Sequence, residues 1–291
     1  MMPEPGSQPV IRLALPKGRM EAGVFALLAD AGIRLGAGAR DYRPHISLDG
    51  FDVKILKHQN IVEMLHLGSR DLGFAGADWV AELDVHPIEL LDTGLDPVRL
   101  VAAVPRGLDL KASRGQPLVV ASEYERLSQA WITRRGLDAR FVRSYGATEV
   151  FPPEDADCIV DNTATGGTLK ANGLEIVDEL MTSSTRLYAN PAALDDGARR
   201  EVIERFVLLV RSVLEARRRV MVEVNVTAAA LEAVIAVLPC MREPTVAPLH
   251  GDAGFAVKAA VPRDRLATLI PEIRARGGTD IVVTNLNQIV M

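Results

Sequence analysis

The sequence predicts an α/β protein with two layered regions of sheet and helix, followed by a smaller βαββαβ domain. Short apolar runs alternate with helix-like stretches up to residue 189, which is the order of an α/β layer. A second series of strands and helices begins after Pro105-Arg106-Gly107, so we expect this half to form its own sheet. Beyond Met221 the order strand, helix, strand, strand, helix, strand is typical of the split βαβ, ferredoxin-like sandwich.

The first series predicts two cationic turns at the ends of strands. Strands are expected at 10–15, 51–56 and 70–76, and helices at 21–31 and 61–67. Lys17 and Arg19 follow the first strand, and Lys57 follows the second. Because the carboxyl ends of strands in an α/β sheet meet ligands, these cations are suited to a polyphosphate. The alternative is that they are solvated turn residues.

The second series leads to a turn rich in glycine and threonine. We expect strands at 98–105, 118–121, 139–142, 158–160, 176–180 and 183–190, and a long helix from Pro191 to about residue 220. After the strand that ends at Asp161-Asn162, the turn TATGGT runs from Thr163 to Thr168. Backbone N–H groups in such a turn can hold a phosphate, and Asp161 is placed to accept hydrogen bonds from sugar hydroxyls. The alternative is a plain turn between a strand and a helix.

The C-terminal stretch, after Met221, is predicted to form the smaller βαββαβ domain. Strands are expected at 222–226, 245–249, 255–261 and 280–284, with helices at 228–238 and 265–275. Nothing in this pattern suggests catalysis, and a module of this kind is usually a ligand sensor or an assembly surface.

Composition excludes several classes of protein. With 48% hydrophobic and 24% charged residues among 291, the chain can bury real cores and is expected to form two or three domains. The net charge of −5 gives no basic footprint for nucleic acid. Cys158 and Cys240 are far apart, which predicts reduced core residues, and no spacing suggests a metal cage. The first ten residues resemble no signal peptide and no apolar run could span a membrane, so we expect a cytoplasmic protein.

Five segments carry a resemblance to a known family. They are LALPKGRM (13–20), RDLGFAGAD (70–78), YGATE (145–149), CIVDNTATGGTLKANGL (158–174) and LPCMREPTVAPL (238–249). In this order the chain resembles the long form of ATP phosphoribosyltransferase, the first enzyme of histidine biosynthesis. The resemblance implies a two-lobed catalytic core similar to type II periplasmic binding proteins, and an ACT-like C-terminal domain that binds histidine. It implies lobe I at 1–98 with 190–219, lobe II at 99–189 and the regulatory domain at 220–291.

The resemblance also implies roles for individual residues. Lys17 and Arg19 match a basic pair facing the polyphosphate, and Asp161 matches the acid on the ribose hydroxyls of 5-phosphoribosyl-1-diphosphate (PRPP). These three are the expected catalytic residues. The expected substrate-binding residues are Lys57, Asp71, Gly76, Asp78, Glu149, Asp161, Ala164, Thr165, Gly166, Gly167, Thr168 and Leu169. The turn Lys57-His58-Gln59-Asn60 departs from the family, which more often has an arginine and an aspartate there. The histidines are expected to be surface or structural residues.

The implied reaction is attack of adenine N1 of ATP on C1 of PRPP, with inversion and loss of diphosphate. Mg²⁺ is expected to be carried by the substrate phosphates. L-Histidine is the expected inhibitor, at the positions that match Asn225, Met241, Thr245 and Asp280, and Asn225 stands where the family often has an aspartate. The expected assembly is a homo-oligomer, a dimer or a hexamer. The rival hypotheses are a two-lobed solute receptor and a metabolite-sensing regulator, neither of which would release diphosphate.

Overall fold

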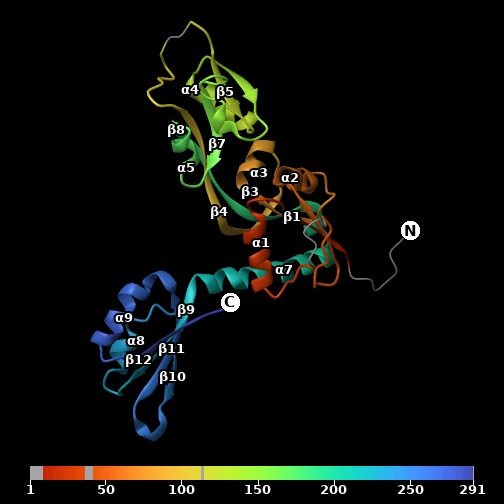
Figure 1. Cartoon of the computed structure of the whole chain (residues 1–291). Coiled ribbons are helices and arrows are strands. Elements are labelled where there is room, and N and C mark those ends of the chain that lie inside the picture. The colour runs from red at the N-terminus through yellow and green to blue at the C-terminus, as the bar shows by residue number, and fades with distance from the viewer. Residues whose placement is uncertain (1–8, 37–41, 113–114, 291) are drawn as a thin grey trace. The chain divides into compact units, whose positions relative to one another are not determined.

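The computed structural model describes residues 9–36, 42–112 and 115–290. Contacts divide the chain into two compact units (Figure 1). The first consists of Met1–Ala26 with Ile33–Glu204, and the second of Leu27–Gly32 with Arg205–Met291. Within the described residues, no helix combines the length and the apolar character needed to span a membrane.

One mixed sheet forms the centre of the first unit, in the order β2-β1-β3-β8-β4-β7-β5-β6. The strands are β1 (Ile11–Pro16), β2 (Phe51–Leu56), β3 (Leu72–Gly76), β4 (Ile88–Pro105), β5 (Leu118–Ser122), β6 (Ala139–Arg143), β7 (Cys158–Thr163) and β8 (Leu174–Ala189). The trio β2-β1-β3 is parallel, and so is the trio β7-β5-β6. Strands β8 and β4 lie between the two trios in the sheet.

The prediction of a separate sheet for the second series is wrong in one respect. Strands β4 and β8 are 18 and 16 residues long, and they pair antiparallel with each other and with both trios, so the ladder is continuous. The sequence suggested several shorter strands because polar residues and a glycine interrupt the apolar pattern. In the structure these interruptions coincide with register shifts in the β4–β8 ladder, which bend a ribbon without ending it.

Seven helices are described in or beginning in the first unit. They are α1 (Glu21–Asp30), α2 (His58–His66), α3 (Ala77–Leu83), α4 (Glu125–Arg135), α5 (Gly167–Ala171), α6 (Pro191–Asp195) and α7 (Gly197–Arg217). The long helix expected from Pro191 is two helices, because Asp196 leaves the helical conformation with ψ 110°. Its Oδ1 then accepts hydrogen bonds from the backbone N–H groups of Ala198 and Arg199, which caps the start of α7.

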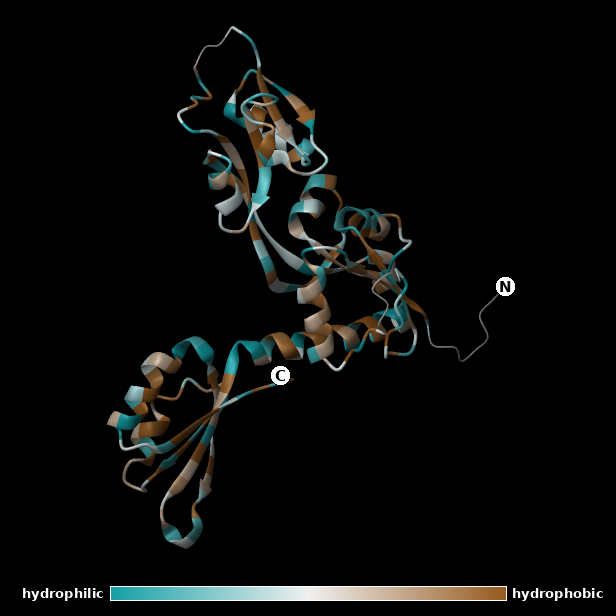
Figure 2. Ribbon diagram, viewed as in Figure 1, coloured by the Kyte–Doolittle hydropathy of each residue, from teal (hydrophilic) through white to brown (hydrophobic). Residues whose placement is uncertain are grey.

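The core of the first unit follows from its apolar strands. In β1, residues on both faces are buried, as expected for a parallel strand covered on both sides. Hydrophobic residues run along the strands of the sheet (Figure 2). Trp131 and Tyr124 are the largest side chains that are almost fully buried, and both come from the segment at α4.

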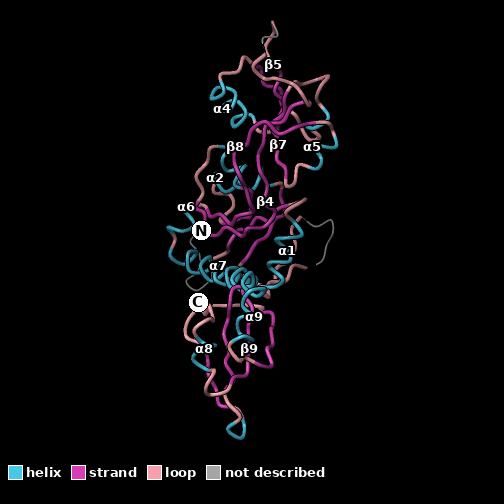
Figure 3. Tube along the Cα trace, turned by 90° about the vertical axis from the view of Figure 1, so that its left-hand side faces the viewer, coloured by secondary structure: helices cyan, strands magenta, loops and turns pink. Residues whose placement is uncertain are grey.

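The second unit confirms the predicted βαββαβ fold. It contains β9 (Arg219–Val226), α8 (Leu231–Ile235), β10 (Thr245–Pro248), β11 (Phe255–Pro262), α9 (Leu266–Ala275) and β12 (Thr279–Asn285). The sheet order is β10-β11-β9-β12 and all three pairings are antiparallel. Alternate valines of β9, from Val220 to Val226, are buried in a core with residues of α8 and α9. Figure 3 labels these three elements in the second unit. In the described part of this unit, α8 and α9 both contribute to the core on this face, and we call the other face the open face.

Candidate active site

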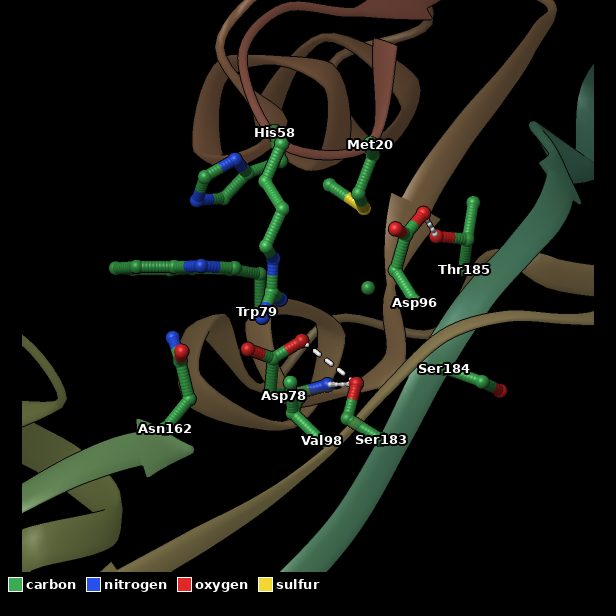
Figure 4. Close-up of a pocket in the computed structure, with 12 residues that line it drawn as sticks. Met20, His58, Asp78, Trp79, Asp96, Val98, Asn162, Ser183, Ser184 and Thr185 are labelled. Atoms are coloured by element: carbon green, nitrogen blue, oxygen red, sulfur yellow. Dashed lines mark hydrogen bonds between the residues drawn. The ribbon is translucent and has the colours of Figure 1, made fainter. Parts of the chain in front are cut away.

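A cavity of about 140 Å³ lies where several strands of the first unit end (Figure 4). Its residues come from the turn after β1, from α2, from the β3–α3 junction and from β4, β7 and β8. They are Arg19, Met20, His58, Gly76, Asp78, Trp79, Asp96, Val98, Asn162, Ser183, Ser184 and Thr185. The lining combines carboxylates, hydroxyls, an aromatic pair and one cation, so it can hold an aromatic ring with polar edges.

Asp78 is the most firmly held acid of this cavity. The Ser183 hydroxyl donates to Asp78 Oδ1 at 2.8 Å and accepts from the Asp78 backbone N–H at 3.0 Å. The Tyr124 hydroxyl donates to Asp78 Oδ2 at 2.6 Å, and Asn162 Nδ2 donates to the Tyr124 oxygen at 2.8 Å. Both carboxylate oxygens of Asp78 therefore have partners, and the chain of bonds connects α3 to β7.

Gly76 is required beside Asp78 for a steric reason. A Cβ atom at position 76 would lie 2.1 Å from Asp78 Oδ1 and 3.4 Å from the Ser183 hydroxyl. No side chain can occupy that position unless the carboxylate moves. The glycine of the sequence motif therefore lets Asp78 turn back against the end of β3.

Aromatic rings form one wall of the cavity. The Trp79 and Tyr124 rings are stacked with centroids 4.7 Å apart, and the His58 ring lies tilted 5.5 Å from Trp79. Burial lowers the pKa of His58, and the neighbouring Arg19 and Lys57 act in the same direction, although Asp78 opposes them. At neutral pH the imidazole is therefore uncharged. The expectation that the histidines are surface or structural residues does not describe His58, which lines the cavity.

Asp96 forms the opposite wall. It has φ +48°, a left-handed conformation that aspartate tolerates better than most residues. The Thr185 hydroxyl donates to Asp96 Oδ2 at 3.1 Å. Figure 4 shows Asp96 and Thr185 side by side, across the cavity from Trp79.

Asp161 lies next to Asn162 on β7 and is close to other charges. Burial and the negative charges of Glu149 and Glu123 together raise the pKa of Asp161 to about 6, although the backbone N–H of Asn162 and the cation of Arg19 act in the opposite direction. Arg19 and Glu149, which come from two distant segments, thus both influence the charge of Asp161. The sequence predicted all three as site residues.

The predicted phosphate turn has the expected backbone. Gly166 has φ +77°, and its N–H donates to the Thr163 hydroxyl at 2.9 Å. Within the described part of the chain, the backbone N–H groups of Thr165 and Thr168 donate to no other residue. Both threonines are exposed, as are Ala164 and Gly167. Leu169 is buried in the apolar cluster behind the turn and anchors it. The helix that follows, α5, has five residues, so the turn itself must provide the donors.

The three predicted lysine and arginine positions differ in their surroundings. Arg19 lines the cavity. The Lys17 ammonium donates to the Tyr42 hydroxyl at 2.7 Å and lies 4.7 Å from the centre of that ring. This hydrogen bond raises the pKa of Lys17, so the ammonium keeps its charge. Lys57 is exposed at the start of α2 and does not line the cavity.

The structure gives Asp71 a structural environment. The side chain is 2% exposed and lies just before β3, at the end of the strand opposite to Gly76 and Asp78. Arg12 donates to both carboxylate oxygens, at 2.6 and 2.9 Å, and Arg199 donates to one at 3.2 Å. These bonds lower the pKa of Asp71 in spite of its burial. The sequence could not distinguish this acid from Asp78, because both belong to the same apolar segment.

The four positions expected to bind histidine occur as two pairs in the second unit. Asn225 Nδ2 donates to Asp280 Oδ2 at 3.2 Å, where a register shift interrupts the β9–β12 ladder. Met241 and Thr245 line a separate cavity with Arg219, Lys258 and others. Thr245 pairs with Lys258, and Asn225 pairs with Ala256, so both residues lie on the open face of the sheet. Asn225 and Asp280 are not among the residues that line the cavity of Met241 and Thr245.

Sequence reasoning missed most of the aromatic and hydroxyl residues of the cavity. Trp79, Ser183 and Thr185 line the cavity but carry no motif of their own, and the last two are positioned by the pairing of β4 with β8. Tyr124, which supports Asp78 from behind the lining, has no motif either. One signal was present: the small polar run Ser183-Ser184-Thr185 within an otherwise apolar strand.

Among the described residues, no group of three or more His, Cys, Asp and Glu side chains could hold a metal ion. Asp161 lies just before the predicted phosphate turn, and the charges of Glu149 and Glu123 act on it. This donor set fits a cation held mainly by phosphate oxygens, because Mg²⁺ keeps several waters and needs few protein ligands.

Comparison with known proteins shows similarity over nearly the whole chain. The profile of a family described as ATP phosphoribosyltransferase matches residues 57–212, and one described as "HisG, C-terminal domain" matches residues 216–288. The chain is 33% identical over 289 residues to an ATP phosphoribosyltransferase of Chlorobium phaeobacteroides, covering 97% of this chain and 98% of that protein. It is 32% identical to one of Pelotomaculum thermopropionicum, covering 96% and 99%. A solved "ATP phosphoribosyl transferase (HisG:HisZ) complex from Thermotoga maritima" matches with a TM-score of 0.63 and 26% identity, over 71% of this chain and 99% of that chain.

Proposed function

Because the chain belongs to the ATP phosphoribosyltransferase family, we propose that its active site is the Asp78–Asn162 cavity together with the adjoining turn of Asp161 to Thr168. The enzyme transfers the 5-phosphoribosyl group of PRPP to N1 of ATP, with release of diphosphate, in the first step of histidine biosynthesis. Its catalytic core is the two-lobed type that resembles type II periplasmic binding proteins. The rival hypotheses of a receptor or a regulator without catalysis are set aside.

The observation that carries the site proposal is the largely exposed turn of Thr163 to Thr168, which closely follows Asp161, a partly buried acid whose pKa responds to Glu149 and Arg19. The turn offers two exposed threonines and unpaired backbone N–H groups, which suit the 5-phosphate. Asp161 precedes it and offers a carboxylate to the ribose hydroxyls. Arg19 lines the cavity and its charge acts on Asp161, so this cation is suited to the diphosphate or the triphosphate.

Catalysis in this proposal depends on alignment and charge more than on proton transfer. As the bond from C1 to diphosphate breaks, positive charge gathers on the ribose ring and negative charge on the leaving group. The Asp161 carboxylate is close to the first charge, and Arg19 and Lys17 are suited to the second. Holding both substrates in line removes much of the entropic barrier. Mg²⁺ on the phosphates would neutralise part of the charge of the leaving group.

We also propose the division of the core into lobe I, residues 1–98 with 190–219, and lobe II, residues 99–189. The two parallel trios support it, since one belongs to each lobe. Since both substrates are central metabolites, we place the reaction in the cytoplasm.

L-Histidine is proposed as the inhibitor, bound on the open face of the second unit by Asn225, Met241, Thr245 and Asp280. The two pairs of residues on one sheet face support a site that a second subunit completes, and so a homo-oligomer, a dimer or a hexamer. Initial rates and sedimentation with and without millimolar histidine test this proposal. An intact enzyme that responds in neither measurement would leave the domain as an assembly surface only.

The direct test of the activity is diphosphate release from ATP and PRPP with Mg²⁺. The matched variant is Arg19→Gln, which removes the charge and keeps most of the side-chain length. We expect release by the parent and a loss of at least about tenfold in kcat/KM in the variant, because one charged contact to a phosphate disappears. Equal rates in parent and variant would remove Arg19 from the site.

A further inference from the structure

Asn162 occupies a position that the proposed roles leave unused. It is the residue after Asp161 on β7, its side chain lines the cavity, and it is half-buried. Figure 4 shows its amide group directed toward the cavity, next to Trp79 and Asp78. Asn162 thus follows the acid proposed for the ribose in the sequence, and its side chain lies beside the aromatic wall.

Tyr124 determines which way the Asn162 amide points. An ionised carboxylate can only accept, so the single proton of the Tyr124 hydroxyl goes to Asp78 Oδ2 at 2.6 Å. The tyrosine oxygen must then accept from its other neighbour, and Asn162 Nδ2 is the donor at 2.8 Å. Burial and the charge of Asp78 raise the pKa of Tyr124 well above its ordinary value, so the hydroxyl keeps its proton. The orientation of the amide follows from this chain of bonds.

The other half of the Asn162 amide is its carbonyl oxygen, Oδ1. No residue that the structure describes donates a hydrogen bond to this Oδ1 atom, and it is not among the buried polar atoms without a partner. It is thus a fixed acceptor open to the cavity. Tyr124 is 1% exposed and stacked on Trp79, so the support of this acceptor is rigid.

We propose that Asn162 Oδ1 accepts a hydrogen bond from the 6-amino group of the adenine of ATP, and that Tyr124 is the positioning residue that fixes it. The inference rests on the proposed function. N1 of adenine must approach C1 of the ribose, and the 6-amino group is bonded to the carbon next to N1. Successive side chains of a strand face opposite sides of the sheet, and in β7 Cys158 and Val160 pack in one cluster while Ile159 packs in another. Asp161 and Asn162 therefore approach the substrates from different sides, and Asn162, on the side of the cavity, is suited to the amino group if Asp161 holds the ribose.

This contact would contribute to catalysis as well as to binding. When the N1 lone pair forms the bond to C1, the bonding pair of C1–O leaves with diphosphate. Positive charge then spreads over N1, C6 and the 6-amino nitrogen. A hydrogen bond from that amino group to a fixed acceptor strengthens as the charge develops, so it stabilises the transition state more than bound ATP. Asn162 itself gains no proton.

The test compares ATP with purine riboside triphosphate, which lacks only the 6-amino group. The two triphosphates differ in intrinsic reactivity, but this difference is the same for every variant. A change in the ratio of their kcat/KM values between parent and variant therefore reports the contact of Asn162 with the 6-amino group. We expect Asn162→Leu to lower the preference for ATP by about tenfold or more while the KM for PRPP stays near the parent value. If the Asn162→Leu variant does not fold, Asn162→Ala is used for the same comparison.

Tyr124→Phe tests the positioning role. It keeps the ring and its stacking on Trp79 but removes both hydrogen bonds, so the amide is free to turn. We expect a smaller loss of preference, with kcat for ATP falling more than its KM rises. The control is Tyr188→Phe, because Tyr188 is also buried in the same unit and does not line the cavity. For this variant we expect the same ratio of kcat/KM values as in the parent.

Two results would overturn the assignment. In the first, Asn162→Leu keeps the parent ratio. In the second, the Asn162→Leu variant loses activity equally with both triphosphates, which would mean that the substitution disturbs the structure and removes no contact to the amino group. A parent that releases no diphosphate from either triphosphate would overturn the proposed function as well, so the two failures are distinguishable in one assay.

Discussion

The Glu82 carboxylate of α3 accepts a hydrogen bond from the backbone N–H of Arg126 at 3.0 Å, in the first turn of α4. Its other oxygen accepts from the N–H of Leu127, also at 3.0 Å. Glu82 is 7% exposed. A side chain from one helix thus caps a different helix, and the negative charge suits the N-terminal end of the dipole.

Glu82→Ala should lower the free energy of unfolding by about 2–4 kcal/mol, because two charge-assisted hydrogen bonds of a buried cap are lost. Chemical denaturation of the purified enzyme measures it. Glu89→Ala is the control, since the Glu89–Arg186 pair is partly exposed and such pairs contribute about 0–1 kcal/mol. Equal effects of the two substitutions would contradict the capping role.

Gly76→Ala should reduce activity without unfolding the protein. The added methyl group would overlap Asp78 Oδ1, so the carboxylate must leave Ser183 and Tyr124. We expect kcat/KM for ATP to fall by about tenfold or more, from the loss of at least one hydrogen bond to a charged group. Gly197→Ala is the matched control, because no atom lies within 4 Å of the added Cβ and φ is not positive. Full activity in Gly76→Ala would mean that the carboxylate geometry is unimportant.

The rate should depend on pH through Asp161. Its pKa in the folded protein is raised to about 6, so the carboxylate form needed for the ribose is lost as the pH falls through about 6. The pH profile of kcat/KM for PRPP is expected to fall on the acid side of that value. In Asp161→Asn this fall on the acid side should be absent, and kcat/KM should be low at every pH. A parent profile that is flat from pH 5 to pH 8 would exclude Asp161 as an essential base or electrostatic group.

Asp161 should also make the stability of the protein depend on pH, in the direction opposite to its effect on the rate. A carboxyl group with a raised folded pKa stabilises the protein when protonated, and this contribution is lost as the pH rises from about 4 through 6. Asp161→Asn should therefore raise Tm relative to the parent at pH 8 more than at pH 4. Melting curves at the two pH values measure it. A constant difference would mean that Asp161 titrates normally.

Thr168→Val should weaken PRPP binding by about tenfold, since the hydroxyl proposed for the 5-phosphate is replaced by a methyl group of the same shape. Equilibrium binding of PRPP is the measurement. Thr133→Val is the control: this threonine is also exposed, and its hydroxyl donates to a carbonyl of its own helix, α4. If both variants bind PRPP as the parent does, the turn does not hold the phosphate.

The turn of Thr163 to Thr168 and the C-terminal fold could be predicted because each depends on local sequence. Gly166 needs a positive φ, and the alternating valines of β9 need one buried face. Both requirements are visible within a few residues.

The rest of the site depends on long-range pairing. Tyr124 meets Asp78 across 46 residues, and Ser183 meets Asp78 across 105. No local pattern distinguishes these residues from ordinary core positions. For the same reason Asp71 and Asp78 looked alike in the sequence, although two arginines bind the first and two hydroxyls bind the second.

The interrupted β4–β8 ladder has a consequence for the shape of the cavity. Asp92 pairs with Arg186, Leu95 with Thr185 and Val98 with Ser183, with a register shift in each interval. The floor of the cavity is thus built where the backbone leaves the regular ladder. Loss of one residue between Asp92 and Val98 would move Asp96 relative to Thr185, while the buried segments on either side kept their places. The spacing of this short stretch, and not only its composition, therefore sets where Asp96 lies in the cavity wall.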